Sequence, residues 1–480
     1  MSGAPTVRAE DDRRRIASDP YRPAYHFTAP ANFLGDPNGT IHWNGAYHLF
    51  YQHNPDEAYD NPRRMHWAHA VSTDLVHWRD LPIALAPMAG GPDRSGCYSG
   101  GAIDLDGAPT LVYYGNPDGI CVATSADDGL RAWSRHPSNP LIPHPTDPQA
   151  GWRAWDPCAW RDGDTWYLVC GGKIEGAGDT AFLFRSQDFV RWEYRGLLYE
   201  PGGESDCAVP DLFRLGKAHV LLFASHERGV QYYVGEMDGE RFVPEHHGRM
   251  NFAGFSLESG TLCAGLTLRD DADRRIMFGW VTEGRSEAAQ RASGWSGVMC
   301  LPRVLSLGGD GLLRIEPAPE LRVLRGVHER FDGLHVPGGA PVPLPGVEAS
   351  CAEVAVAFER ETEGDIGITV GRSPDAAEET RIVYSRTERR LSLDPGASST
   401  APEVVGRDVQ HAPLDLDEDE ALDLRVFIDR SIVEVFANGR QCLTQRIYPA
   451  RRGSRGVALL AEVGATVRSI DVWQMRSIWS

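Results

Sequence analysis

The sequence predicts an all-β protein in which a five-bladed β-propeller is followed by a C-terminal β-sandwich. Three observations support this fold class: strand-like runs instead of helical periodicity before residue 320, a repeated pattern of Ser, Asp and Trp, and a change of composition after residue 319. At 480 residues the chain is too long for one ordinary hydrophobic core. We therefore expect two domains.

Short strand-like runs recur through the first part of the chain, and Gly, Asp, Asn and Pro separate them. Runs of this length with such boundaries are typical of strands joined by tight turns. The runs span residues 41–52, 110–114, 166–170, 181–185, 220–224 and 276–281.

A faint internal repeat indicates how these strands are organised. Segments 72–78, 125–133 and 186–192 each begin with Ser, continue through Asp and an apolar residue, and end with Trp. Their serines are 53 and 61 residues apart (72 to 125 and 125 to 186). A unit of about 40–60 residues fits one four-stranded propeller blade. Five blades fit residues 24–318, which leaves residues 1–23 as an N-terminal extension.

The last part of the chain has a different pattern. Residues 319–337 are predicted to be a linker in which 320–335 form one short helix, and residues 338–480 form the β-sandwich. Apolar and polar residues alternate in several runs there, and Asn438-Gly439 is a hairpin signal. The alternating runs are 422–428, 432–436 and 467–473.

Composition and charge exclude several classes of partner. The formal net charge is −19, with Lys+Arg 48 against Asp+Glu 67. This balance argues against nucleic acid and against anionic membranes. No apolar run reaches the length of a membrane helix, and no secretory signal precedes residue 21. We expect a cytoplasmic protein; secretion with removal of a signal is the alternative.

The cysteines and histidines predict neither a metal site nor a disulfide framework. The 9 cysteines are scattered and never form a C-x-x-C pair, and no H-E-x-x-H motif exists. The chemistry suggested below requires no cofactor, and none is expected.

Three acidic segments stand out against this background. Asp36 lies between Gly35 and Pro37, Asp156 precedes Pro157, and a third segment holds Glu204 and Asp206. Taken alone, each is best interpreted as a turn or a solvated loop. Inner strands of different blades converge on one axis, however, so these carboxyl groups can meet there. Paired carboxyl groups are what the cleavage of a glycosidic bond requires.

A series of motifs resembles glycoside hydrolase family 32, the β-fructosidases. Asn32-Phe33-Leu34-Gly35-Asp36-Pro37-Asn38-Gly39 resembles the family's W-M-N-D-P-N-G, and Phe50-Tyr51-Gln52-His53-Asn54-Pro55 resembles F-Y-Q-x-N-P. Further similar segments are 66–78, 96–100, 275–280, 295–303 and 431–439. The resemblance covers nearly the whole chain from about residue 30 to about residue 475.

The resemblance implies roles for individual residues. Asp36 is expected to be the nucleophile that forms a covalent fructosyl-enzyme, with net retention of configuration. Asp156 is expected to stabilise the transition state by accepting hydrogen bonds from fructose hydroxyls. Trp67 and Trp295 are expected to offer apolar faces to the sugar; for Trp295 a place in the blade core is the alternative. The expected substrate-binding residues are Asn38, Gln52, Trp67, Tyr98, Ser99, Arg153 and Trp295.

Two departures from the family pattern affect the pocket around the first two carboxyl groups. Gly35 replaces the Asn that precedes the nucleophile, which removes a side-chain amide. Trp155 replaces the Arg of the R-D-P motif, so a cationic partner is lost unless Arg153 takes its place.

The third departure affects the acid/base, because the E-C-P-D motif is not intact. Alignment on Pro210-Asp211 puts Ala208 at the acid/base position, whereas alignment on Cys207 puts Asp206 there. The acid/base is therefore expected to be Asp206 or Glu204, with Asp211 in a structural or substrate-orienting role.

The sequence thus predicts a retaining glycoside hydrolase that cleaves β-fructofuranosidic bonds of sucrose, levan or inulin. Its expected partner is such a fructoside, and the sandwich is the expected surface for any homo-oligomer. One alternative is a fructotransferase of the levan fructotransferase type. A second alternative, from another class, is a carbohydrate-binding protein without catalysis. A third is an inverting arabinan-type propeller hydrolase, which would share the fold.

Overall fold

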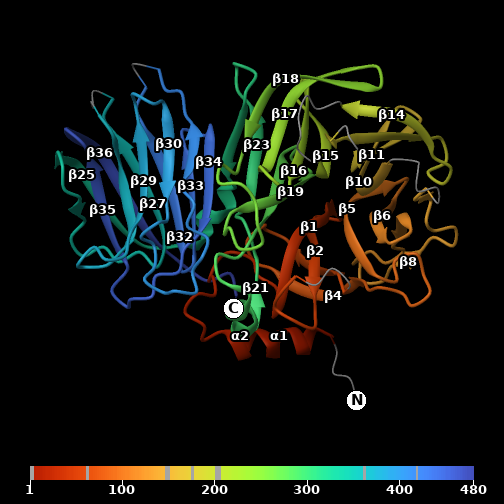
Figure 1. The fold of residues 1–480 in the computed structure, drawn as a ribbon, viewed down its shortest axis with the longest axis horizontal. Coiled ribbons are helices and arrows are strands. Elements are labelled where there is room, and N and C mark those ends of the chain that lie inside the picture. Colours follow the sequence, from red (N-terminus) through yellow and green to blue (C-terminus); the bar gives the residue numbers. More distant parts are fainter. Residues whose placement is uncertain are drawn as a thin grey trace.

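The structure is a computed structural model that describes residues 5–60, 64–145, 152–174, 178–199, 207–360, 364–417 and 420–479. Within these ranges the strands form seven sheets. Five sheets surround one axis, and the two remaining sheets pack face to face beside them (Figure 1). The predicted propeller and sandwich are therefore confirmed.

The first two blades follow the chain in order, from the innermost strand outward. The first contains β1 (Asn32–Trp43), β2 (Ala46–Asn54), β3 (His66–Ser72) and β4 (Arg79–Leu85). The second contains β5 (Gly96–Leu105), β6 (Ala108–Asn116), β7 (Gly119–Thr124) and β8 (Ser134–Arg135), and β9 (Ile142–Pro143) also pairs with β7.

The other three blades repeat this arrangement. The third contains β10 (Trp152–Asp162), β11 (Thr165–Ile174), β13 (Ala181–Ser186) and β14 (Glu193–Tyr199), with β12 (Gly178–Asp179) beside β11. The fourth contains β15 (Ala208–Leu215), β16 (Ala218–Ser225), β17 (Gly229–Asp238) and β18 (Arg241–Arg249). The fifth contains β19 (Leu262–Arg269), β20 (Arg275–Val281), β23 (Arg303–Leu307) and β24 (Leu313–Pro317), with β22 (Val298–Met299) beside β20.

The five innermost strands close a ring around the axis. Strand β1 contacts β5, β5 contacts β10, β10 contacts β15, β15 contacts β19, and β19 contacts β1 again. Strand β21 (Trp295–Ser296) pairs in parallel with β1 and so ties the end of the propeller to its first blade. A closed ring leaves only the outer strands as sheet edges. Prolines at 82 in β4 and 244 in β18 suit such edges, because proline cannot donate to a further strand.

The Ser–Asp–Trp repeat corresponds to one recurring turn. It joins the third and fourth strands in each of the first three blades. In the first blade the Asp74 carboxylate accepts hydrogen bonds from the backbone N–H of Val76 (3.0 Å) and His77 (2.8 Å). Asp188 receives the equivalent pair in the third blade. The repeat is therefore a turn in which an aspartate satisfies backbone donors.

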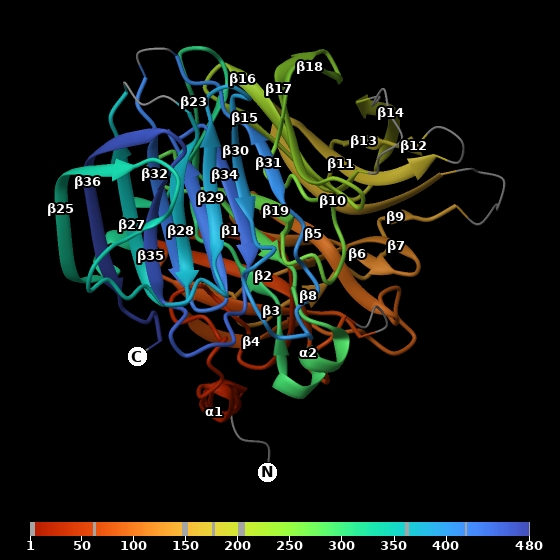
Figure 2. The same ribbon diagram turned by 60° about the vertical axis from the view of Figure 1, so that its left-hand side comes forward.

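The C-terminal sandwich consists of two six-stranded sheets (Figure 2). The first sheet contains, in order, β25 (Arg325–Pro337), β36 (Gly464–Met475), β27 (Cys351–Phe358), β32 (Asp423–Asp429), β33 (Ile432–Ala437) and β34 (Gln441–Arg446). The second contains β26 (Val342–Pro343), β35 (Gly456–Ala461), β28 (Ile366–Arg372), β29 (Thr380–Ser385), β30 (Arg390–Asp394) and β31 (Gln410–Pro413). A separate hydrophobic core fills the space between the two sheets.

Two local predictions differ from the structure. The single helix expected over 320–335 is a 3-10 helix, η2 (Pro319–Leu324), followed directly by β25, so the sandwich begins at Arg325 and not at 338. Arg325 leaves the helical region with φ −63° and ψ 126°, and its strand pairs along β36. The run 41–52 is two strands, because Asn44 and Gly45 turn the chain with positive φ.

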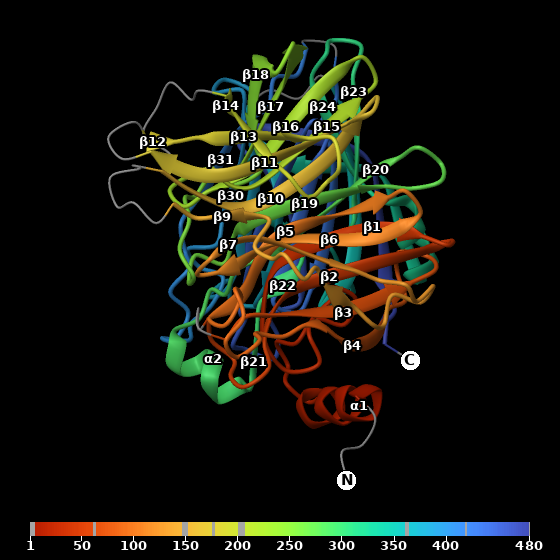
Figure 3. The ribbon, with the colours of Figure 1, turned by 90° about the vertical axis from the view of Figure 1, so that its right-hand side faces the viewer.

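The N-terminal extension contains a helix that strand periodicity did not indicate. Helix α1 (Pro5–Ile16) lies beneath the first blade (Figure 3). Arg13 holds it there through an ion pair with Asp80 (2.8 Å) and a stacking contact with the Trp479 ring (3.5 Å to its centre). The other helix of the described chain, α2 (Glu287–Ser293), lies in the fifth blade just before β21. No helix among the described residues is both long and apolar enough to cross a membrane.

A buried polar cluster joins the propeller to the sandwich. His26 lies between two sandwich carboxylates, Asp429 (2.9 Å) and Glu434 (3.1 Å). Glu434 also accepts hydrogen bonds from Arg303 (2.6 Å) and from the backbone of Leu301 (2.6 Å) in the fifth blade. All of these side chains are fully buried, so each charge has a partner of opposite sign. The 431–439 motif therefore contributes to the domain interface.

Candidate active site

The innermost strand of every blade carries an irregularity near its beginning. The register with the second strand shifts between Leu34 and Pro37, Cys97 and Gly100, Trp155 and Pro157, Ala208 and Asp211, and Leu262 and Gly265. Such bulges turn side chains out of the hydrogen-bonded ladder, and they are common next to active sites. Asp36, Ser99 and Asp156 all lie in these bulges, on three different blades.

Asp36 is held by a short chain of polar side chains. The Ser99 hydroxyl donates a 2.6 Å hydrogen bond to Asp36 Oδ2, and Gln52 Nε2 donates to Ser99 Oγ (3.3 Å). Burial raises the pKa of Asp36 to about 6, although the Ser99 hydrogen bond opposes the rise. At neutral pH the carboxyl group is therefore mostly ionised, with one oxygen fixed by Ser99.

Packing explains why the residue before the nucleophile is a glycine, Gly35. A Cβ at this position would lie 2.9 Å from the Phe33 ring and 3.1 Å from Gln52 Cβ. The Phe33 ring therefore occupies the space that a side chain at position 35 would need. A substitution here has to displace Phe33 or Gln52, both of which border the nucleophile.

Asp156 shares the electrostatic environment of Asp36. It is buried, with a left-handed φ of 50°, and its Oδ2 accepts a 3.2 Å hydrogen bond from the backbone N–H of Val209 in the fourth blade. Burial and then the negative charge of Asp36 raise the pKa of Asp156 to about 7. A carboxyl group whose ionisation is opposed by the charge of a second one resembles the paired carboxyl groups of glycosidases.

Asn38 and Trp67 lie below this pair. Both are fully buried, and the Trp67 ring packs between Phe50 and Tyr113. Trp67 Nε1 donates to the Tyr98 carbonyl (2.9 Å), and with its amide oxygen turned toward Gln52, Asn38 accepts from the Gln52 backbone N–H (3.1 Å). The expectation that Trp67 offers an open ring face is therefore wrong in this structure. Through its hydrogen bond to Tyr98, the residue holds the bulge of the second blade.

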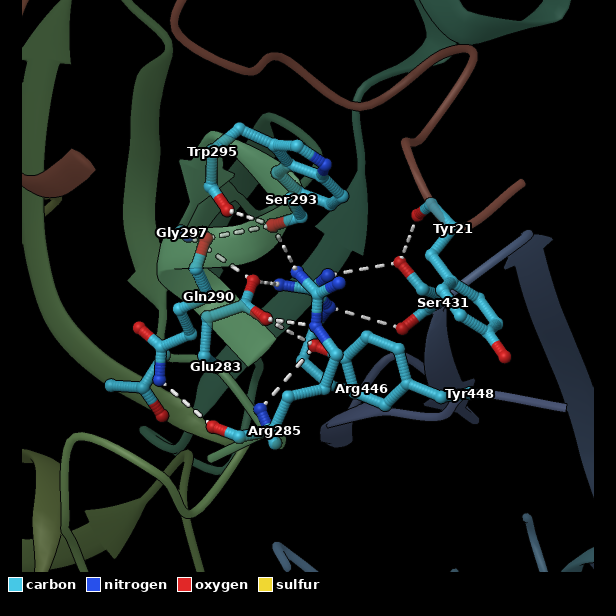
Figure 4. Close-up of polar contacts among 12 residues, drawn as sticks. Tyr21, Glu283, Arg285, Gln290, Ser293, Trp295, Gly297, Ser431, Arg446 and Tyr448 are labelled. Carbon is cyan, nitrogen blue, oxygen red and sulfur yellow. Dashed lines mark hydrogen bonds and ion pairs between the residues drawn. The ribbon is translucent and has the colours of Figure 1, made fainter. Parts of the chain in front are cut away.

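Trp295 likewise lies inside the protein. Its side chain is 1% exposed, its Nε1 donates to Asp19 Oδ2 (2.6 Å), and Arg285 and Arg446 stack against its ring. Figure 4 shows it beside Glu283, which binds both arginines. Trp295 is therefore a core residue, as the alternative interpretation expected. Its predicted contact with sugar is not supported, because arginines cover the ring.

The network around Trp295 connects the fifth blade with the sandwich and the N-terminal extension (Figure 4). Glu283 Oε1 accepts from Arg446 (2.6 Å) and Oε2 accepts from Tyr448 Oη (2.7 Å). Arg446 also donates to Ser431 Oγ (2.9 Å), and Ser431 Oγ donates to the Tyr21 carbonyl. These contacts fix the fifth blade, the sandwich and the N-terminal extension to one another.

Two predicted residues border the site from the second and third blades. The hydroxyl of Tyr98 has its pKa raised by burial and by the charges of Asp60 and Asp156. Arg153 is exposed, and its positive charge opposes a rise in the pKa of the Tyr114 hydroxyl that burial and Asp156 produce. A cation is therefore present near Asp156, although Trp155 occupies the position of the family's arginine.

The two candidates for the acid/base, Asp206 and Glu204, lie outside the described residues. The adjoining Cys207 is buried, and its carbonyl accepts a 3.1 Å hydrogen bond from the Gly172 N–H. A Cβ on Gly171 would lie 2.2 Å from that carbonyl, so the close approach requires glycine. Ala208, the position of the acid/base in the other alignment, is buried and carries no carboxyl group.

Asp211 is a structural residue in this arrangement. Its Oδ2 accepts hydrogen bonds from the Thr267 backbone (2.8 Å) and the Thr267 hydroxyl (2.6 Å) in the fifth blade. Burial raises its pKa, and the positive charge of Arg275 is the largest opposing influence. It therefore joins the fourth and fifth blades.

One further carboxyl group, which no motif indicated, acts on the nucleophile through its charge. Asp60, between two of the recognised motifs, is partly buried, and its charge raises the pKa of Asp36. It belongs to neither motif, so nothing in the sequence indicated that its charge acts on the nucleophile. Among the described residues, no group of three or more His, Cys, Asp or Glu side chains is arranged to hold a metal ion.

Comparison with known families assigns the chain. The family model described as "Glycosyl hydrolases family 32 N-terminal domain" matches residues 26–317. The model described as "Glycosyl hydrolases family 32 C terminal" matches residues 324–474. The chain belongs to glycosyl hydrolases family 32. The resemblance of its motifs to that family is thereby confirmed, and the protein is a glycoside hydrolase.

Individual members of family 32 resemble the chain over nearly its whole length. A sucrose-6-phosphate hydrolase from Escherichia coli is 31% identical, covering 95% of this chain and 95% of that protein. A fructan 6-exohydrolase from Beta vulgaris is 30% identical, covering 90% and 82%. The crystal structure of fructan 1-exohydrolase IIa from Cichorium intybus is 27% identical, with a TM-score of 0.86 over 96% of this chain and 98% of that one.

Proposed function

We propose that this family 32 protein is a retaining β-fructofuranosidase that hydrolyses sucrose or fructans through a covalent fructosyl-enzyme. The observation that carries the proposal is the Asp36 carboxylate, fixed by Ser99 (2.6 Å) and electrostatically coupled to Asp156. The relatives support the substrate class, because they include a fructan exohydrolase and a sucrose-6-phosphate hydrolase. The Cichorium enzyme has also been solved with 1-kestose bound.

In the first step the free oxygen of Asp36 attacks the anomeric carbon of the fructosyl unit, and the glycosidic bond breaks. The leaving oxygen takes a proton from the acid/base, which we assign to Asp206 or Glu204 on sequence grounds. The Ser99 hydrogen bond holds Oδ2, so Oδ1 is the oxygen free to attack. One difficult displacement is thereby divided into two easier ones.

In the second step water attacks the fructosyl ester, and the acid/base accepts its proton. Fructose leaves with the configuration of the substrate, because two inversions occur at the same carbon. Asp156 accepts hydrogen bonds from fructose hydroxyls in both steps. Such bonds accelerate the reaction when they strengthen as positive charge develops on the ring.

Hydrolysis is favoured over the transfer alternative by the relatives at about 30% identity, which are named as hydrolases. A fructosyltransferase from A. japonicus matches at only 18% identity and so supports the fold alone. Incubation with sucrose, inulin and levan, followed by product analysis, separates the two. Free fructose supports the hydrolase, whereas a difructose dianhydride or longer oligomers support the transferase.

The non-catalytic alternative is tested with the same substrates. Binding of fructans without turnover by the wild-type protein would contradict the proposal. Turnover that is lost in Asp36→Asn supports it.

A further inference from the structure

A large cavity lies at the opposite end of the propeller axis from Asp36. Its volume is about 850 Å³, which is within the usual range of about 300–1,000 Å³ for ligand sites. All five innermost strands line it with residues that come after the bulges at their beginnings, so the cavity is separate from the candidate active site. The lining positions on these strands are 40 in β1, 101–104 in β5, 158–162 in β10, 211–214 in β15, and 266, 267 and 269 in β19.

Hydrogen bonds between the blades close the floor of this cavity. Thr40 Oγ1 in the first blade donates to the Thr267 carbonyl in the fifth (3.0 Å). Asp211 in the fourth blade accepts from Thr267, and Cys158 Sγ in the third blade donates to Asp211 Oδ1 (3.6 Å). Four blades are therefore tied together at the floor, and the cavity is preformed in the folded protein.

Arg275 of β20 presents an incompletely paired guanidinium group to the cavity. Its Nη1 donates to Thr267 Oγ1 (3.3 Å), and the group stacks on the Phe213 ring (4.6 Å to its centre). Within the described ranges of the chain it forms no ion pair, although it is half-buried. Burial lowers its pKa, and the negative charge of Asp211 is the largest opposing influence. Because a guanidinium group has five N–H donors, most of them remain available to a ligand in the cavity.

Two stacked aromatic rings supply an apolar surface on the side of the third blade. The rings of Trp160 in β10 and Tyr167 in β11 lie 5.4 Å apart between their centres, with an angle of 17° between their planes. Both side chains are half-buried and line the cavity, so part of each ring is open to it. A sugar ring has an apolar face of C–H groups that packs on such rings while its hydroxyls stay free to form hydrogen bonds.

Charges of both signs surround the cavity. Among the described residues that line it are four arginines and five Asp or Glu residues. This balance does not favour a phosphate or another anion, which would require an excess of positive charge. It suits a neutral sugar, because each hydroxyl group both donates to carboxylates and accepts from guanidinium groups.

We propose that this cavity is a second, non-catalytic carbohydrate site, which holds a neutral oligosaccharide with one sugar ring on Trp160 and Tyr167 and with hydroxyl groups bonded to Arg275. Neither Asp36 nor Asp156 lines the cavity, so the bound sugar is not cleaved there. The active site stays accessible when this site is filled, because it lies at the other end of the axis. The inference concerns binding alone and does not depend on the proposed reaction.

The test measures binding in an Asp36→Asn background, so that a bound fructoside is not consumed. Trp160→Ala and Arg275→Gln are introduced separately into this background. Trp192→Ala is the matched control, because Trp192 is also a half-buried tryptophan of the third blade but does not line the cavity. Circular dichroism and thermal melting establish which variants are folded, and if one cavity variant does not fold, the other decides the test.

Three neutral sugars serve as probes: sucrose, 1-kestose and maltotriose. Isothermal titration calorimetry gives their affinities, and crystal structures of Asp36→Asn with each sugar locate the bound molecules. At least one sugar is expected in the cavity, in contact with Trp160 and Arg275. Its dissociation constant at this site should rise by about tenfold or more in Trp160→Ala and in Arg275→Gln, and should stay unchanged in Trp192→Ala.

Inorganic phosphate is titrated in parallel as a probe for an anion site. Absence of all three sugars from the cavity overturns the inference, and so does equal weakening of binding in Trp192→Ala. Phosphate that binds in the cavity more tightly than the sugars, and that depends on Arg275, also overturns it. If wild-type protein turns over no fructoside, the proposed function fails, whereas this inference is decided by the binding measurements alone.

Discussion

The hydroxyl of Ser99 donates a 2.6 Å hydrogen bond to Asp36 across the boundary between the second and first blades. This bond stabilises the ionised carboxylate and partly offsets the effect of burial on its pKa. The nucleophile is therefore tuned by a neighbouring blade, which a single blade in isolation could not provide.

Ser99→Ala is expected to raise the pKa of Asp36 above its present value of about 6, because the stabilised form is the charged one. The acid limb of kcat/KM then moves to higher pH, and activity at pH 6 falls by about tenfold or more, as expected for a lost hydrogen bond to a charged group. Ser392→Ala, whose hydroxyl bonds His411 in the sandwich, serves as the control and keeps the wild-type profile. An unchanged acid limb in Ser99→Ala would remove Ser99 from the tuning of Asp36.

Asp156→Asn is expected to lower kcat/KM on sucrose by about 10²–10³-fold, the usual loss when a transition-state hydrogen-bonding group is removed. The charge of Asp36 raises the pKa of Asp156, and this coupling is absent in the variant. Asp162→Asn, at the exposed end of the same strand, is the matched control. Wild-type kinetics in Asp156→Asn would contradict its assigned role.

The acid/base is identified by comparing Asp206→Asn with Glu204→Gln. Removal of the true acid is expected to slow hydrolysis of sucrose by about 10²–10⁴-fold, the contribution typical of general acid–base catalysis. Cleavage of a fructosyl substrate with an activated leaving group should be largely retained, because that group needs no proton. Similar mild effects in both variants would show that neither residue is the acid.

The interface network makes a prediction about stability. Arg446→Met leaves Glu283 buried with one cation fewer, and we expect a loss of about 3–5 kcal/mol in the free energy of unfolding. Arg451→Met, which breaks an exposed pair with Asp375, should cost less than about 1 kcal/mol. Chemical denaturation measures both; equal effects would mean that the buried network adds nothing to stability.

Glu283 also gives this stability a pH dependence. Its arginine partners, Arg446 first, hold its folded-state pKa at about 2, well below the ordinary value of 4.5. A depressed carboxyl pKa contributes stability above the unfolded pKa, and this contribution is lost as the pH falls toward the folded value. Wild-type protein should therefore lose stability between about pH 4.5 and 2, and Arg446→Met should lose less over that range.

Much of the fold was predictable because its signals are local. Turn residues, strand periodicity and the Ser–Asp–Trp repeat each occupy a few consecutive positions, and the repeat proved to be one turn built around Asp74 and its equivalents. The prediction of one helix over 320–335 was wrong because the apolar spacing of this segment also suits an edge strand. Strand β36, more than a hundred residues later, decides that choice by pairing with β25.

The site was predictable where motif and geometry coincide, as at Asp36 and Asp156. Trp67 and Trp295 were misplaced, because a sequence does not tell which way a tryptophan ring points. The partners that cover Trp295, Arg285 and Arg446, come from two domains and meet only in the folded chain. Asp60 was missed for the same reason: its neighbours Trp280 and Ser296 are remote in sequence.

The central claim is that Asp36 becomes covalently bonded to fructose. Asp36→Asn should lower kcat by at least about 10⁴-fold, the scale of loss when a nucleophile is removed. The direct measurement is mass spectrometry of peptides from protein quenched with acid during turnover of sucrose. We predict a mass increase of one fructosyl unit on the peptide that contains Asp36, absent in Asp36→Asn. An adduct on another peptide, or release of fructose with inverted configuration, would contradict the account.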